Sequence, residues 1–174
     1  NFPSNRRLPP DNLCKLRTIC SKENMQRPAV LVTGGSARIG AEIVRRFADN
    51  GWHVMIHYGF SGDEAEALAS SLTSADSVQC DLRDSEAAVG MIEALAGRLA
   101  DWRVLVNSAS VFNPDDVTAL DPQTNTEAMQ VNATSPTRIA QAFLAHAQSQ
   151  AGRCVIQVTD QKLANPNPDF FSYT

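Results

Sequence analysis

The sequence alternates short apolar runs with segments that carry apolar residues at helical spacing, and this alternation restricts the fold more than any other feature. The apolar runs are continuous, which is typical of strands that are buried on both faces of a sheet. Strands are predicted at 29–33, 52–57, 77–80, 103–107 and 153–159, and helices at 39–49, 62–72, 85–99 and 126–149.

This order of strands and helices predicts an α/β fold. Each parallel strand needs a crossover, and right-handed crossovers place helices on both faces of the sheet. The sequence therefore predicts a doubly wound parallel sheet of the Rossmann type. Within it, Ser61 and Glu64 are predicted to form a capping box, and Asp84 is predicted to cap the next helix.

The composition agrees with a reduced globular protein. The chain has 174 residues, a net charge of −4 and 43% hydrophobic residues, which excludes collagen-like and strongly disordered classes. No apolar run approaches the roughly 18 residues that span a bilayer. The four cysteines are scattered and form no Cys/His cluster, so we expect a cytoplasmic protein with no metal site. Neither a nucleic acid nor a membrane is an expected partner.

The first residues differ in character from the remainder. Residues 1–28 hold six Lys or Arg and two acidic residues, a net charge of +4, whereas the remainder holds nine and seventeen, a net charge of −8. This pattern is compatible with a transit peptide, and also with an upstream segment that precedes a true start at Met25. A secretory signal is not favoured, because this stretch lacks the apolar region that such a signal needs. We expect 1–27 to be an unstructured or non-native basic tail, and 28–174 to form the domain.

A glycine-rich turn joins the first strand to the first helix. Gly34, Gly35 and Gly40 allow a tight turn and a close backbone approach, and the following helix N-terminus offers free N–H groups to a pyrophosphate. A purely structural turn is the alternative. No Gly-Lys-Ser/Thr follows, so this is not a nucleoside-triphosphate loop.

The residues Thr33-Gly34-x-x-x-Arg38-Ile39-Gly40 resemble the cofactor motif of short-chain dehydrogenases/reductases. Arg38 stands where most of that family has Gly, and this departure resembles the pteridine reductase branch. The resemblance implies that Arg38 contacts both the cofactor phosphates and the substrate, as a guanidinium can. The alternative is a solvated surface arginine.

The end of the second strand bears on the choice of cofactor. A carboxylate there would select NAD by binding the ribose 2′-OH, but the stretch 56–61 contains none, which favours NADP(H). His57, Tyr58 and Ser61 match the branch's His-Tyr-x-Arg-Ser pattern, whereas Phe60 replaces its Arg. His57 could also be a strand-end histidine with no ligand role.

Three further segments extend the resemblance. Asp81 and Leu82 follow the third strand, where the family's Asp binds the adenine; a turn cap is the alternative. Segment 107–112 is similar to the family's Asn-Asn-Ala-Gly. This similarity implies that Ser108 and Ala109 contact the cofactor and that Ser110 contacts both cofactor and substrate. It also implies that Phe112 stacks on a pterin; packing of Phe112 in the core is the alternative. Asn132 matches an Asn expected to bend the fourth helix. The cofactor-binding residues expected are Gly34, Ser36, Arg38, Ile39, Gly40, His57, Tyr58, Ser61, Asp81, Leu82, Ser108, Ala109 and Ser110.

The resemblance also identifies the residues of the reacting end. Asp160 ends the fifth strand, and Tyr173 follows 13 residues later, where the family has Ser and the Tyr of Tyr-x-x-x-Lys. Asp in place of Ser again resembles the pteridine reductase branch; a turn residue is the alternative. An ordinary tyrosine has a pKa near ~10, so a proton donor here needs a nearby cation. The catalytic residues expected are Asp160 and Tyr173, and the substrate-binding residues are Arg38, Ser110, Phe112, Asp160 and Tyr173.

The resemblance covers residues 28–174 and implies an incomplete member of the family, with about five of seven strands. The family's Lys would fall three residues beyond Thr174, so we expect the chain by itself to turn over little substrate. The implied activity is NADPH-dependent reduction of a ring C=N in a pterin, such as a dihydrobiopterin, dihydromonapterin or dihydrofolate-like ring. Reduction of a carbonyl substrate and non-catalytic NADP sensing are the alternatives. A homodimer or homotetramer is the implied assembly.

Overall fold

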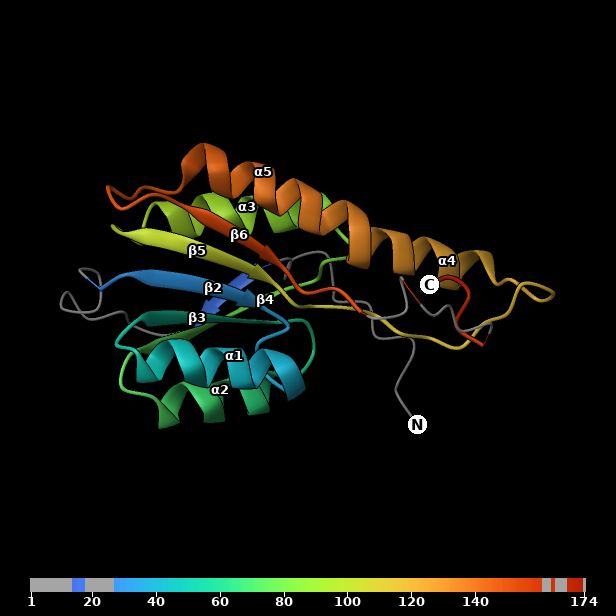
Figure 1. Cartoon of the computed structure of the whole chain (residues 1–174), viewed down its shortest axis with the longest axis horizontal. Coiled ribbons are helices and arrows are strands. Elements are labelled where there is room, and N and C mark those ends of the chain that lie inside the picture. The colour runs from blue at the N-terminus through green and yellow to red at the C-terminus, as the bar shows by residue number, and fades with distance from the viewer. Residues whose placement is uncertain (1–13, 18–26, 161–163, 165–168, 174) are drawn as a thin grey trace.

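The computed structural model describes residues 14–17, 27–160, 164 and 169–173. Within these residues, six strands form one sheet in the order β1-β4-β3-β2-β5-β6 (Figure 1). The strands are β1 (Cys14–Arg17), β2 (Ala29–Thr33), β3 (His53–Tyr58), β4 (Ala75–Cys80), β5 (Trp102–Asn107) and β6 (Cys154–Gln157). Strands β2 to β6 pair in parallel, which confirms the predicted doubly wound sheet.

Two helical layers cover the sheet. Helices α1 (Arg38–Asp49) and α2 (Gly62–Ser71) lie on one face, and α3 (Ser85–Ala96) and α5 (Ser135–His146) lie on the other (Figure 1). Each layer encloses its own apolar core, because the sheet residues are buried on both faces. In the core under α3 and α5, the rings of Trp102 and Phe143 meet edge to face at 5.0 Å.

The predicted helix at 126–149 is a longer, interrupted element. It begins with α4 (Pro122–Met129), passes through the π-helical turn η2 (Gln130–Thr134) and continues as α5 to His146. Asp121 caps its start by accepting a hydrogen bond from the N–H of Thr124 at 2.7 Å. Helix α4 extends beyond the end of the sheet, and the chain returns to it near its C-terminus (Figure 1).

Part of the expected tail differs from the prediction. Residues Cys14–Arg17 form β1 and pair antiparallel with β4, so at least this segment is ordered at the edge of the sheet. The physical reason is that the edge of β4 offers backbone groups to pair with, because without β1 these groups would be unpaired. Residues 1–13 and 18–26, which carry most of the predicted tail, lie outside the described residues.

One of the two predicted helix caps is present. The carboxylate of Asp84 accepts hydrogen bonds from the N–H groups of Glu86 and Ala87, both at 3.0 Å, and begins α3 as predicted. Ser61 does precede α2, but its hydroxyl makes no capping hydrogen bond. The capping box was therefore wrong in its contacts, because the backbone at Ser61 (φ −92°, ψ 62°) departs from the extended conformation usual at such caps.

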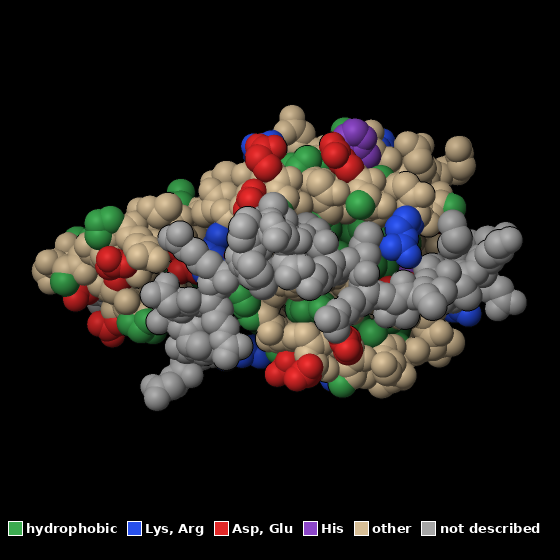
Figure 2. All heavy atoms as spheres, turned by 180° about the vertical axis from the view of Figure 1, so that it is seen from behind, with side chains coloured by type: hydrophobic (Ala, Val, Ile, Leu, Met, Phe, Trp, Pro, Cys, Tyr) green, Lys and Arg blue, Asp and Glu red, His purple; other side chains and the backbone are tan. Residues whose placement is uncertain are grey.

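The order of the strands identifies where a ligand can bind. Strand β2 pairs with both β3 and β5, so the crossovers reverse direction between β2 and β5. In open α/β sheets the crevice at the carboxyl ends of the strands next to this point receives the ligand. Across the described residues, no helix combines the length and the hydropathy needed to cross a membrane. On the back face, the acidic and basic side chains drawn in colour are scattered (Figure 2).

Candidate active site

The glycine turn after β2 packs backbone against backbone. Gly34 has φ +63°, and a Cβ placed on it would lie 2.8 Å from the Cα of Ala109. A Cβ on Gly40 would lie 2.1 Å from the carbonyl oxygen of Gly34. These positions therefore require glycine, and the turn, the first turn of α1 and the segment after β5 form one tight unit.

The N-terminus of α1 suits an anion. Its N-cap residue, Ala37, makes no side-chain capping bond, and its first turn carries no acidic residue. Helix N–H groups and the helix dipole both favour a negatively charged group at such an end. The observed turn therefore fits the pyrophosphate of a dinucleotide, and Ser36 lies in it.

Thr33 was missed as a site residue by sequence reasoning, although it stands in the quoted motif. Its hydroxyl oxygen accepts hydrogen bonds from the backbone N–H groups of Ser108 at 3.0 Å and Ala109 at 3.1 Å. These contacts draw the segment after β5 against the glycine turn. Ser108 and Ala109 thus lie beside the turn, and Ser110 beyond them is exposed.

His57 is placed differently from a direct cofactor ligand. Its ring is buried, its Nδ1 accepts a hydrogen bond from the N–H of Gly34 at 3.2 Å, and its Nε2 donates to the carbonyl of Cys80 at 3.0 Å. Burial lowers the pKa of His57 to about 4, which keeps the ring neutral. The geometry favours the alternative to a direct ligand: His57 holds the glycine turn against the end of β4.

Two other expected cofactor residues have buried side chains. Tyr58 packs in the core beneath α1 and α2, and Leu82 packs in the opposite core. The backbone carbonyl of Leu82 also accepts a hydrogen bond from the hydroxyl of Ser135 at 2.6 Å. The sequence pattern placed these residues near the site without showing that their side chains point into the cores.

Arg38 has an unusual backbone. Its φ is +51°, a left-handed conformation that favours glycine and costs an arginine of the order of 1–2 kcal/mol. This explains why most of the resembled family has Gly here. The side chain of Arg38 is exposed at the start of α1, and the neighbouring Ile39 is 64% exposed, so both stand at the mouth of the turn.

Asp81 pairs with an arginine that sequence reasoning did not single out. Both carboxylate oxygens of Asp81 accept hydrogen bonds from the Arg83 guanidinium, the shortest from Nη2 at 2.6 Å. Asp81 also accepts from the backbone N–H of Arg83 at 3.0 Å, so it is a turn residue as well. The only available signal was the proximity of Arg83 to Asp81 in the sequence.

Asp160 and Tyr173 come together at the reacting end. The Tyr173 hydroxyl donates a hydrogen bond to Oδ2 of Asp160 at 3.0 Å. Burial raises the pKa of Tyr173 above its ordinary value, and the hydrogen bond and charge of Asp160 raise it further. The described surroundings therefore raise the pKa of Tyr173, whereas easy proton donation needs a lower pKa.

Phe112 completes an aromatic cluster with the C-terminal residues. The Phe170 ring stacks on it with centroids 3.9 Å apart and planes at 9°, and the Tyr173 ring meets it edge to face at 4.7 Å. Phe112 is nevertheless 47% exposed. It is therefore not a core residue, although Phe170 covers one face of its ring.

Asp115 is a second residue that sequence reasoning missed. Its carboxylate accepts hydrogen bonds from the hydroxyl of Ser172 and from the N–H of Ser172, the latter at 2.9 Å. Its backbone bonds to Asp169 and Phe171 as an isolated bridge. Asp115 thus fastens the segment before Tyr173 to the segment that carries Phe112, across 57 residues of sequence.

Asn132 lies in the π-helical turn η2, where the helix departs from regular α geometry as expected. Its side-chain oxygen accepts a hydrogen bond from the N–H of Val111 at 2.8 Å, and its amide donates to the carbonyl of Val111 at 3.0 Å. Asn132 therefore fixes the segment next to Phe112.

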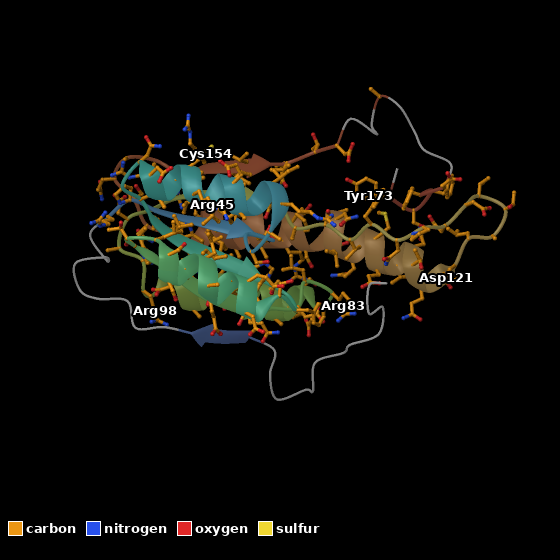
Figure 3. All side chains as sticks on the ribbon, turned by 90° about the horizontal axis from the view of Figure 1, so that it is seen from below. Arg45, Arg83, Arg98, Asp121, Cys154 and Tyr173 are labelled. Carbon is orange, nitrogen blue, oxygen red and sulfur yellow. The ribbon has the colours of Figure 1, made fainter. Side chains whose placement is uncertain are left out.

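Tyr173 and Arg83 lie at one end of the sheet, opposite Cys154 and Arg98 (Figure 3). Searching the described residues for a cluster of metal-binding side chains finds none.

Comparisons with known proteins agree with this fold. Residues 28–174 match the family model of short chain dehydrogenases. The structure of alternative dihydrofolate reductase 1 (FolM) from Brucella suis, in complex with NADP, is 35% identical with a TM-score of 0.77 and covers 84% of this chain and 62% of that one.

The curated proteins that match this chain are named for different activities. A probable galactose dehydrogenase of Rhizobium meliloti is 27% identical over 150 residues, 83% of this chain and 58% of that protein. A 3-oxoacyl-[acyl-carrier-protein] reductase of Staphylococcus aureus is 31% identical over 87 residues, 48% of this chain and 35% of that protein. This chain thus spans less than two thirds of the length of each of these proteins. The glycine turn, the doubly wound sheet and the family match together show that the chain belongs to the short-chain dehydrogenase family.

Proposed function

We propose that the protein reduces a pterin, such as a dihydrobiopterin, dihydromonapterin or dihydrofolate-like ring, at a ring C=N with NADPH. The observation that carries this proposal is the pair formed by Tyr173 and Asp160, whose oxygens lie 3.0 Å apart beside the Phe112 ring. An acidic partner for the tyrosine and an aromatic face next to it suit a flat, nitrogen-rich substrate better than a simple ketone.

NADP(H) is the cofactor of this proposal. The glycine turn and the bare N-terminus of α1 suit the pyrophosphate, and no carboxylate occurs in the stretch 56–61 to favour NAD. The Brucella suis neighbour named as a dihydrofolate reductase is in complex with NADP. When bound, NADPH supplies the hydride. Arg38, Ser36 and Ser108 would contact the cofactor, with Gly34 and Gly40 allowing its close approach.

The chain's own residues supply the proton and the orientation. Tyr173 donates a proton to the nitrogen of the reduced bond, and Asp160 holds Tyr173 and the polar edge of the pterin. Phe112 and Ser110 bind the ring. Because burial and Asp160 raise the pKa of Tyr173, a cation must lower it for fast proton transfer near neutral pH. We therefore expect the 174-residue chain by itself to turn over little substrate.

Reduction of a carbonyl is the second candidate. Relatives named as a galactose dehydrogenase and a 3-oxoacyl reductase favour it, and a tyrosine donor serves a carbonyl oxygen equally well. Asp160 is the feature against it, because its carboxylate would lie close to the developing negative oxygen. A non-catalytic NADP-binding protein is a third reading, and the position of Tyr173 next to Asp160 and Phe112 weighs against it.

The test is NADPH consumption by the full-length protein that carries this chain. Dihydrobiopterin and dihydrofolate are compared with an acetoacetyl thioester and a simple ketone, and Tyr173→Phe serves as the inactive control. The proposal expects turnover of at least one dihydropterin and its loss in Tyr173→Phe. Turnover of the carbonyl compounds alone would overturn the pterin assignment, and NADPH binding without any turnover would support the non-catalytic reading.

A further inference from the structure

We expect the adenosine ribose to lie at the end of β3, and the sequence around this strand end supplies no cation. No Lys or Arg occurs in the sequence between Arg46 and Arg83. Beyond β3 the chain presents Phe60 and then the first turn of α2, which carries Asp63 and Glu64. A 2′-phosphate is a strong anion, and this strand end offers no Lys or Arg of its own to pair with it.

Arg83 reaches this place from the turn after β4. Its guanidinium carbon lies 5.0 Å from the centroid of the Phe60 ring, within the range of a cation–π contact. Asp81 holds the guanidinium from one side, with Nη2 to Oδ2 at 2.6 Å. Glu127 of α4 holds it from another side, with Nη1 to Oε1 at 3.5 Å. The positive charge is thus positioned beside the end of β3 by three different segments.

We propose that Arg83 is a specificity-determining residue that binds the 2′-phosphate of NADP(H), in place of a cation at position 60. In Rossmann sheets the adenosine ribose lies at the end of the strand next to the glycine turn, and an arginine there accommodates the 2′-phosphate. The strand here is β3, and Phe60 directly follows it. The inference rests on the proposed cofactor but not on the proposed substrate.

The carboxylates of Asp81 and Glu127 around Arg83 lead to a second prediction. Arg83 is paired with two carboxylates, so an incoming phosphate competes with them for the guanidinium. Asp81 bonds it at several points, whereas the ion pair with Glu127 is longer, at 3.5 Å. Removing the charge of Glu127 should therefore strengthen NADP⁺ binding, because the guanidinium then has one competing anion fewer.

The experiment measures the dissociation constants of NADP⁺ and NAD⁺ by titration calorimetry on the purified protein, with no substrate present. Arg83→Ala should weaken NADP⁺ about 10-fold or more, the usual effect of losing a charged hydrogen bond, and change NAD⁺ less than about 2-fold. Glu127→Gln should strengthen NADP⁺ alone. NADP⁺ binding should also fall more steeply with salt than NAD⁺ binding, and Arg83→Ala should remove that difference.

Two further variants control this result. Arg98 follows the opposite end of α3 and lies far from Arg83 (Figure 3), so Arg98→Ala removes the same charge and should leave both constants unchanged. Phe60 is 53% exposed, so Phe60→Arg can be introduced without disturbing the core, and it should restore NADP⁺ preference to the Arg83→Ala protein. Thermal unfolding of each variant confirms that it is folded.

The outcomes separate this inference from the proposed function. If Arg83→Ala weakens NADP⁺ and NAD⁺ equally, or changes neither, Arg83 does not select the 2′-phosphate and the inference is wrong while the proposed cofactor stands. If the unaltered protein does not bind NADP⁺, the cofactor assignment and the inference fail together. The dihydropterin assay is independent of both results.

Discussion

The cofactor end and the reacting end of this site are built in different ways. At the cofactor end, the glycine turn is held by backbone contacts and by two side chains, Thr33 and His57, that are almost completely buried. At the reacting end, Asp160 is exposed, and Tyr173 is held by side-chain hydrogen bonds and ring contacts. One end depends on the packing of the sheet, and the other on a few contacts between distant segments.

This difference predicts different responses to change. A substitution in the packed turn must move backbone, so it should affect the stability of the whole domain. A substitution at the reacting end removes exposed contacts, so it should alter local order or a pKa and leave the sheet intact. The following changes test this contrast, beginning with the largest expected effect.

Gly40→Ala should damage the cofactor end most. The added Cβ would lie 2.1 Å from the carbonyl oxygen of Gly34, so the turn and the helix cannot both keep their positions. We expect a loss of about 3 kcal/mol or more in the free energy of unfolding. Gly90→Ala is the matched control: its Cβ meets nothing within 4 Å in the exposed middle of α3, and it should stabilise by about 0.5–1 kcal/mol. Equal effects in urea unfolding would contradict the packed turn.

Acid should weaken the same end through His57. Burial lowers its folded pKa from 6.5 to about 4, so the unfolded chain binds the proton more tightly. The stability is therefore complete above about pH 6.5 and falls by up to about 3 kcal/mol as the pH drops to 4. His57→Asn should flatten this slope, whereas His146→Asn on α5 should not. His53, whose pKa burial also lowers, and Asp101, whose pKa is lowered by its hydrogen bond with Arg103, contribute to the slope that remains.

Asp160→Asn tests the reacting end without touching the fold. It removes the charge that raises the pKa of Tyr173, so the phenol should ionise at a lower pH. The chain has only two tyrosines, and in a Tyr58→Phe background the ultraviolet absorbance of the phenolate reports Tyr173 alone. Asp63→Asn, on α2, should leave this titration unchanged. A titration that is the same in the Asp160→Asn protein would show that the two groups do not interact.

Asp115→Asn should have the smallest effect on global stability. Asp115 fastens Ser172 through its carboxylate, so the Ser172 amide should exchange its hydrogen faster while the free energy of unfolding changes by less than about 1 kcal/mol. Among the described residues, its neighbour Asp116 bonds Thr118 and Ala119 within its own turn. Asp116→Asn should therefore leave the exchange of Ser172 unchanged; an increase in both variants would mean that the loop, and not Asp115, holds the segment.

The sequence was informative about the sheet and less so about side-chain contacts. The alternation of apolar runs predicted the parallel strands, since burial on both faces requires such runs, and the position of Asp160 after the strand predicted its meeting with Tyr173. The contacts of His57 could not be predicted, because its partners Gly34 and Cys80 are each 23 residues away in the sequence. Asp115 and Ser172 are 57 residues apart, and no local pattern indicates such a pair.

The most direct test of the central claim is the binding of a dihydropterin at Phe112. The dissociation constant of dihydrobiopterin is measured with the NADP⁺-loaded full-length protein, for the unaltered sequence, Phe112→Leu and Phe171→Leu. Phe171 is similarly exposed, at 46%, and makes the matched control. Stacking on Phe112 predicts about 3- to 10-fold weaker binding for Phe112→Leu alone. Unchanged binding in Phe112→Leu, or no binding by the unaltered protein, would contradict the account.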